Sequence, residues 1–176
     1  MNAFKLRTLV FALALVGSAS AMAAGSTTAT LTNSATIAAS CTLTATGFTS
    51  TYDPVTANAG AAGTPVKDTS GSVTYTCTNG GTNALIALDG GGHDTGTSAI
   101  PIRHLAGTTH TTDLLAYNLY QESTYTTPWG YTATAELAAV EDGTQHVQTV
   151  YTEIPAGQSL LHVDTYNDTV IATITF

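Results

Sequence analysis

The sequence predicts an all-β domain, and three observations lead to this prediction. Charged residues make up only 9% of the chain, while threonine, alanine and glycine are abundant, and threonine favours strands. Residues 27–46 alternate between small or apolar side chains and mostly threonine or serine, the period-two pattern of a strand with one dry face. Further short alternating runs are separated by turn residues, which indicates a β-sandwich.

The N-terminal segment is typical of a secretory signal peptide, predicted to cover residues 1–24. Lys5 and Arg7 precede a short apolar run, and small residues of the Ala-x-Ala type follow it. The run is too short to span a bilayer. Its removal would leave an exported chain long enough for one hydrophobic core.

The alternating run at residues 27–46 is too long for one domain of this size. As a strand it would span about 65 Å, whereas a domain of this length has a diameter of about 40 Å. We therefore expect part of the run to pair with another sheet, the alternative being an ordinary edge strand within the domain.

Cys41 lies within this run, and Cys77 is the only other cysteine. An isolated pair in an exported protein is expected to form one disulfide. Neither cysteine has a histidine or a second cysteine at metal-ligand spacing, which argues against a metal site.

The remaining elements follow in order along the chain. Residues 56–68 are rich in alanine, glycine and threonine and predict a loop. Asn-Gly-Gly at residues 79–81 predicts a turn, and hence a hairpin over residues 73–88. Residues 132–140 stay open between helix and strand. Strands are predicted at residues 72–77, 83–89, 99–105, 114–121, 146–154 and 169–176.

The charge balance and motif content exclude several functions. The formal net charge is −8 and becomes more negative once Lys5 and Arg7 leave, which excludes nucleic-acid binding as a main activity. The five histidines have no metal-ligand spacing, and no Gly-x-Ser-x-Gly motif is present. No cofactor, no metal and no enzymatic activity are therefore expected.

Several short motifs occur in a characteristic order: AASCTLTA at 38–45, TYDP at 51–54, GSVTYTCT at 71–78, YNLY at 117–120, PWG at 128–130, IPAGQ at 154–158 and YNDTV at 166–170. Through these motifs the chain resembles the spore coat U family, which includes the pilins of archaic (Csu-type) chaperone–usher pili. The resemblance covers nearly all of the chain after the predicted signal peptide.

The resemblance implies an incomplete immunoglobulin-like β-sandwich that lacks its final strand. Residues 25–37 would be an N-terminal donor strand extension, and residues 38–176 the pilin domain. The family disulfide corresponds to Cys41 and Cys77. A periplasmic chaperone would lend a strand to the subunit, and at the outer-membrane usher the extension of the next copy would replace it. The implied function is that of a major structural subunit of a surface pilus that supports adhesion and biofilm formation. A separate tip adhesin is a further partner of such a pilus.

The resemblance also implies residues for both halves of this contact. The donor strand would present Ala29, Leu31, Asn33, Ala35 and Ile37. The edges of the acceptor groove would carry Leu43, Ala45, Val170, Ala172, Ile174 and Phe176. Asn33 departs from the apolar residue usual in the family, and a buried amide without a partner costs about 1–3 kcal/mol. Asn33 therefore either lies at a bend or faces a shallow or wet pocket.

Two other functions remain open from the sequence. A monomeric secreted carbohydrate-binding module could use Trp129 as a platform, although Pro128 and Gly130 favour an anchor in the core. A spore-coat or matrix protein could share the fold without forming a pilus. A rod subunit is favoured over a tip adhesin because a tip needs a further binding domain and no donor strand.

Overall fold

The computed structural model describes residues 24–81 and 83–176, so the predicted signal peptide lies outside the described residues except for Ala24. Residues up to Thr36 form a unit separate from Ile37–Phe176. Residues 24–40 are exposed and have no regular secondary structure. Of the run at residues 27–46, Cys41–Thr46 is the part that pairs with another strand among the described residues. The expectation that the earlier part pairs with another sheet stays a prediction.

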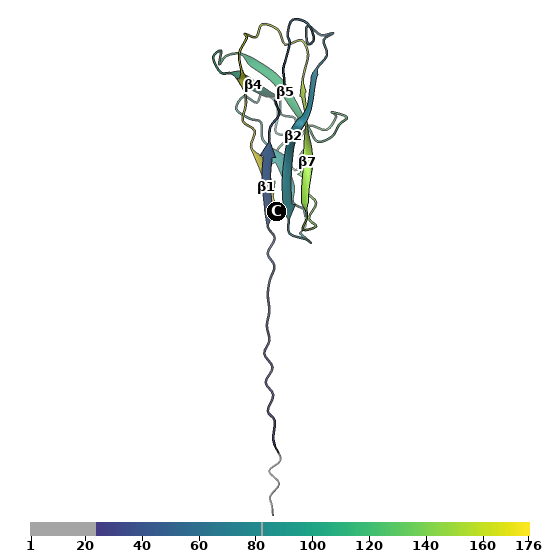
Figure 1. The fold of residues 1–176 in the computed structure, drawn as a ribbon, viewed down its shortest axis with the longest axis vertical. Coiled ribbons are helices and arrows are strands. Elements are labelled where there is room, and N and C mark those ends of the chain that lie inside the picture. Colours follow the sequence, from purple (N-terminus) through teal and green to yellow (C-terminus); the bar gives the residue numbers. More distant parts are fainter. Residues whose placement is uncertain (1–23, 82) are drawn as a thin grey trace, which may run out of the picture. The chain divides into compact units, whose positions relative to one another are not determined.

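The unit Ile37–Phe176 is built from antiparallel strands in two sheets (Figure 1). The larger sheet has the order β1-β2-β7-β5-β4-β8, and the smaller has the order β6-β3-β9. The strands are β1 (Cys41–Thr46), β2 (Val66–Cys77), β3 (Leu85–Leu88), β4 (Arg103–Gly107), β5 (Leu114–Tyr120), β6 (Leu137–Ala138), β7 (Gln145–Ile154), β8 (Tyr166–Asn167) and β9 (Ala172–Thr175). Among the described residues, no helix is long and apolar enough to cross a membrane.

The core lies between the two sheets and follows from the alternation of each strand. Every second residue of β2 from Gly71 onward is buried, and β5 and the end of β7 show the same period. Trp129, in the segment after β5, is fully buried and donates its indole N–H to the carbonyl of Ile86 at 2.8 Å. This burial confirms the expectation that Trp129 anchors the core.

The predicted hairpin over residues 73–88 does not form. β2 pairs with β1 and β7, whereas β3 pairs with β6 and β9, so the turn after β2 carries the chain from one sheet to the other. β2 also begins at Val66, inside the segment predicted as a loop. An irregularity between Asp68 and Gly71, where β2 has one residue more than β7, interrupts the alternation there and hides the strand's first part.

A buried guanidinium joins the two sheets. Arg103 on β4 has no exposed surface. It donates hydrogen bonds of 2.7–2.8 Å to the carbonyls of Leu88, Asp89 and Trp129. Because β4 belongs to the larger sheet and Leu88 to the smaller one, these bonds fix the sheets against each other.

Candidate functional site

The two sheets leave one side of the core open between strands β1 and β9. Among the described residues, β1 pairs only with β2 and β9 only with β3, so each has a free edge. A cavity of about 290 Å³ lies beside these edges. Core side chains line it, including Val73, Leu88 and Leu119. These three side chains are themselves buried, so the cavity lies directly over the hydrophobic core on this side.

A second cavity of about 510 Å³ adjoins the first. It lies between the segment that follows β1, residues 48–54, and residues 161–168 before β9. Leu105, Leu115 and Ile154 contribute apolar surface to its lining. We refer to the 290 Å³ cavity as the narrow cavity, to the 510 Å³ cavity as the wide cavity, and to both together as the groove.

Phe48 and Asp168 line both cavities and so mark the middle of the groove. The ring of Phe48 packs on Tyr117, with 5.5 Å between ring centroids. The Tyr117 hydroxyl donates a 2.7 Å hydrogen bond to Asp168. Burial and this hydrogen bond raise the pKa of Tyr117, so the phenol stays protonated and remains a donor.

Asp168 also fixes the neighbouring backbone. Its carboxylate accepts hydrogen bonds from the amides of Gly92 and Thr169, both at 2.8 Å. Gly91, the residue before Gly92, has φ +70°. A Cβ added at Gly91 would lie 2.1 Å from the Asp168 carboxylate, so only glycine fits there. Asp168 thus brings the glycine-rich loop after β3 against the chain that leads into β9.

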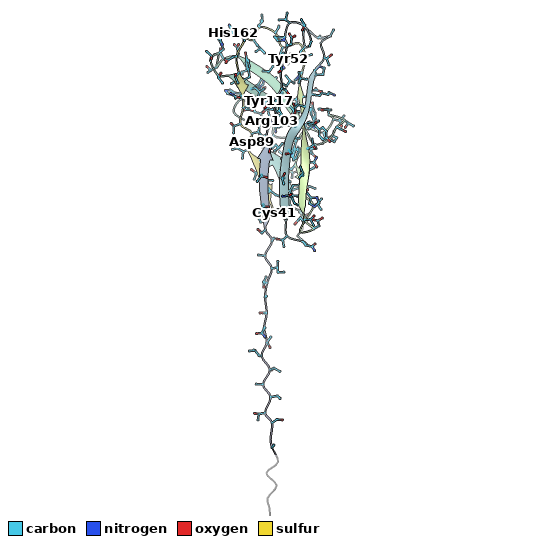
Figure 2. The ribbon with its side chains drawn as sticks, viewed as in Figure 1. Cys41, Tyr52, Asp89, Arg103, Tyr117 and His162 are labelled. Atoms are coloured by element: carbon cyan, nitrogen blue, oxygen red, sulfur yellow. A yellow bond between two sulfur atoms is a disulfide. The ribbon has the colours of Figure 1, made fainter. Side chains whose placement is uncertain are left out.

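Tyr52 and the IPAGQ motif hold the wide cavity in place. The Tyr52 hydroxyl donates to the carbonyl of Pro155 at 3.1 Å and accepts from the amide of Gln158 at 2.9 Å. The Gln158 side chain pairs with both backbone groups of Ala116 on β5, at 2.6 and 2.9 Å. Figure 2 shows Tyr52 and His162 at the end of the domain away from Cys41, with Tyr117 and Arg103 between.

A pair of stacked histidines, His110 and His162, lies at the wide cavity. The rings of His110 and His162 have centroids 4.0 Å apart and are almost parallel. The backbone N–H of His162 donates to Asp113, and the backbone N–H of His110 donates to Asp164. These hydrogen bonds hold the pKa of each carboxyl below its usual range.

We expect acid to destabilise the part of the domain around the wide cavity only below about pH 4. The Thr56 hydroxyl and the amides of Val55 and Thr56 lower the pKa of Asp53 from 3.8 to about 2. Asp113 and Asp164 are shifted in the same direction. Because the folded state lowers these pKa values, their stabilisation is complete above the ordinary value and is lost as pH falls through the folded values.

The measurement is the melting temperature between pH 6 and pH 2. It should stay level down to about pH 4 and then fall steeply, and Asp53→Asn should flatten part of that fall. A melting temperature that does not change between pH 5 and pH 2 would contradict the assignment.

Three of the six predicted groove residues line a cavity, and the other three do not. Ala45, Val170 and Ala172 line the narrow cavity. Leu43 and Ile174 are partly buried and pack against the core, while Phe176 is 56% exposed. The wide cavity and the central Asp168 were not predicted. The YNDTV motif contains Asp168, but its sequence does not reveal that this carboxylate meets Tyr117.

The predicted disulfide is present, and the predicted donor residues are exposed. Cys41 and Cys77 are bonded and stand opposite each other in the β1–β2 ladder. Leu31 and Ile37 are 85% and 86% exposed, and Ala29, Asn33 and Ala35 are exposed as well. Trp129 offers no platform for a sugar because its side chain is fully buried.

The fold and the groove define a domain of curled antiparallel sheets with a groove along one side of its core. The chain belongs to the Spore Coat Protein U domain family, whose model matches residues 27–173. It is 39% identical over 128 residues to Protein U of Myxococcus xanthus, a match that covers 72% of this chain and 69% of that protein.

A solved structure shares the fold. It is the chaperone–tip adhesion subunit pre-assembly complex CsuC–CsuE from the archaic chaperone-usher Csu pili of Acinetobacter baumannii. The TM-score is 0.51 at 20% sequence identity, and the match covers 80% of this chain. The chain spans 41% of the length of the chain that it matches there. The predicted resemblance to the spore coat U family is thus confirmed, and the likeness to the Csu pilus complex is one of fold.

Proposed function

We propose that this protein is a non-enzymatic structural subunit of an archaic chaperone–usher pilus that polymerises by donor-strand exchange. The domain, residues 38–176, would be an incomplete immunoglobulin-like sandwich. Residues 25–37 would supply the missing strand to the next copy. The fibre would reach the cell surface through the periplasm and support adhesion and biofilm formation.

The observation that carries the proposal is the groove between two free strand edges. A free edge exposes a row of N–H and C=O groups, and an added strand satisfies them. Here the edges of β1 and β9 belong to different sheets and lie beside one cavity lined by core residues. One inserted strand would therefore pair with an edge and bury apolar side chains in the core at once.

The N-terminal segment has the properties required of the inserted strand. Residues 24–40 have no partner strand among the described residues, and their apolar side chains are exposed. Leu31 and Ile37 fall on one face with Ala29 and Ala35, which is the alternation that a strand with one buried face needs. Insertion into another copy would be head-to-tail and would give an open fibre.

The proposal also assigns partners. A periplasmic chaperone would fill the groove before assembly, and an outer-membrane usher would catalyse the exchange. A tip adhesin could end the fibre. The solved complex that shares the fold pairs a chaperone with a tip adhesion subunit, which supports a chaperone as partner here.

A coat or matrix component is the second candidate, favoured by membership of the Spore Coat Protein U domain family. The two candidates differ in what must accompany the protein. A pilus subunit needs a chaperone and an usher encoded nearby, whereas a coat component that folds by itself needs neither.

The test deletes residues 27–37 and co-expresses the variant with its chaperone and usher. We expect the full chain to form multimers that resist SDS and dissociate on heating. The deletion variant should accumulate as chaperone-bound monomer with no multimer, because the groove stays intact while the strand that fills it is gone.

A matched control replaces Thr28, Thr30 and Thr32, on the opposite face of the same segment, by serine. This variant should still assemble. If the deletion variant polymerises as the full chain does, donor-strand exchange through this segment is wrong.

A further inference from the structure

A polar residue occupies the centre of the segment proposed to enter the groove. Of the five positions on its apolar face, Ala29, Leu31, Asn33, Ala35 and Ile37, Asn33 is the third. It remains central whichever direction the strand takes. An amide buried against apolar surface costs about 1–3 kcal/mol unless it finds a hydrogen-bond partner.

The centre of the groove also carries a polar group. Asp168 lies where the narrow and wide cavities meet. An ionised carboxylate has about four acceptor sites. Gly92 and Thr169 donate to Oδ1, and Tyr117 donates to Oδ2. One acceptor site on Oδ2 therefore remains for a further donor.

We propose that Asn33 of one copy donates its side-chain amide to Asp168 of the next copy, and that this contact sets the register of the inserted strand. This inference rests on the proposed function. Successive residues on one face of a strand are about 6.6 Å apart. With Asn33 over Asp168, Leu31 and Ala35 therefore enter the two cavities on either side.

The contact would also select against a shifted strand. Because side chains alternate, a strand can shift only in steps of two residues without turning its apolar face outward. A shift of two residues would place Leu31 or Ala35 over Asp168 and leave its remaining acceptor site covered by apolar surface. It would also move the Asn33 amide into the narrow or the wide cavity, so the hydrogen bond to Asp168 would be lost.

The test compares substitutions in the full chain, co-expressed with chaperone and usher, by the amount of SDS-resistant multimer. Asn33→Asp places two carboxylates together and should reduce multimer at least about tenfold. The matched control is Ser34→Asp, which adds the same charge on the opposite face and should assemble as the unmodified chain does. Asn33→Leu should also reduce multimer, because it covers the carboxylate without donating to it.

The rescue uses the other half of the pair. Combining Asn33→Asp with Asp168→Asn restores one donor facing one acceptor and should return multimer to within about threefold of the unmodified chain. The yield of chaperone-bound monomer shows whether the Asp168→Asn subunit folds. If it does not fold, Asn33→Leu still decides, because this variant adds no charge and should fail only if the Asn33 amide has a polar partner in the groove.

The outcomes separate this inference from the function on which it rests. If the unmodified chain forms no multimer, the proposed function fails and the inference fails with it. If the unmodified chain assembles and Asn33→Asp assembles equally well, only the inference is overturned. Asn33→Leu assembling as well as or better than the unmodified chain would also overturn it, since Asn33 would then face apolar surface or a bend.

Discussion

Replacing Arg103 by methionine is expected to lower the free energy of unfolding by about 3–5 kcal/mol. The guanidinium is fully buried and donates to three carbonyls, those of Leu88, Asp89 and Trp129. Methionine fills part of the volume but leaves all three acceptors without a donor. The loss is a large part of the about 5–15 kcal/mol that stabilises a typical domain.

The measurement is urea unfolding of the purified protein, compared with a control at the other cation of the domain. Lys67 has a half-exposed side chain and lies 3.6 Å from Glu153. Its replacement by methionine should cost less than about 1 kcal/mol. Arg103→Lys should fall between the two, because a single ammonium cannot reproduce the planar fork of donors. Equal midpoints for Arg103→Met and Lys67→Met would contradict a connecting role for Arg103.

The second large effect is expected from the disulfide. Replacing both Cys41 and Cys77 by alanine should cost about 3–4 kcal/mol, because the bond closes a long loop in the unfolded chain. The two residues are separated by 36 positions in sequence. The bond also holds β1, an edge strand that flanks the narrow cavity, onto β2. Its loss should therefore loosen β1 as well as lower the free energy of unfolding.

Two measurements separate these effects. Urea unfolding of the unmodified protein with and without reductant should show the same loss as the double alanine variant. Protection of the β1 amides from hydrogen exchange should fall more than that of β5, which lies inside the larger sheet. A double variant within about 1 kcal/mol of the unmodified protein would show that the β1–β2 ladder is sufficient without the bond.

The sequence predicts this fold well where alternation is uninterrupted. β5 and β7 were predicted to within a residue or two, because every second residue is buried throughout β5 and over the last five residues of β7. The cysteine pairing was also predictable, since an exported chain with two cysteines has one possible intramolecular bond.

The pairing of strands was harder to predict, because it depends on residues far apart in the sequence. Asn-Gly-Gly at residues 79–81 has the turn chemistry of a hairpin, yet β2 already has β1 and β7 as partners. A local turn signal cannot show which neighbours a strand will have. The run at residues 27–46 illustrates the same limit, since it alternates throughout and yet only Cys41–Thr46 pairs with a strand among the described residues.

The candidate site was predictable at its edges and not at its centre. Ala45, Val170 and Ala172 follow from the alternation near the two ends of the domain and line the narrow cavity. Asp168 looks like an ordinary loop residue in the sequence, because its contacts with Tyr117 and Gly92 come from distant segments. The sequence contains one indication that Arg103 is buried. It is a cation between the apolar residues Ile102 and Leu105 in a chain with few cations.

The burial of Arg103 has a consequence for how copies of the protein meet in solution. Among the described residues, the guanidinium is internal and Lys67 is the cation that reaches solvent, against twelve acidic residues. The surface therefore behaves as a polyanion at neutral pH. Repulsion between two such surfaces extends over about 10 Å at 0.1 M salt and about 30 Å at 0.01 M. Side-by-side association of these molecules should accordingly weaken as ionic strength falls.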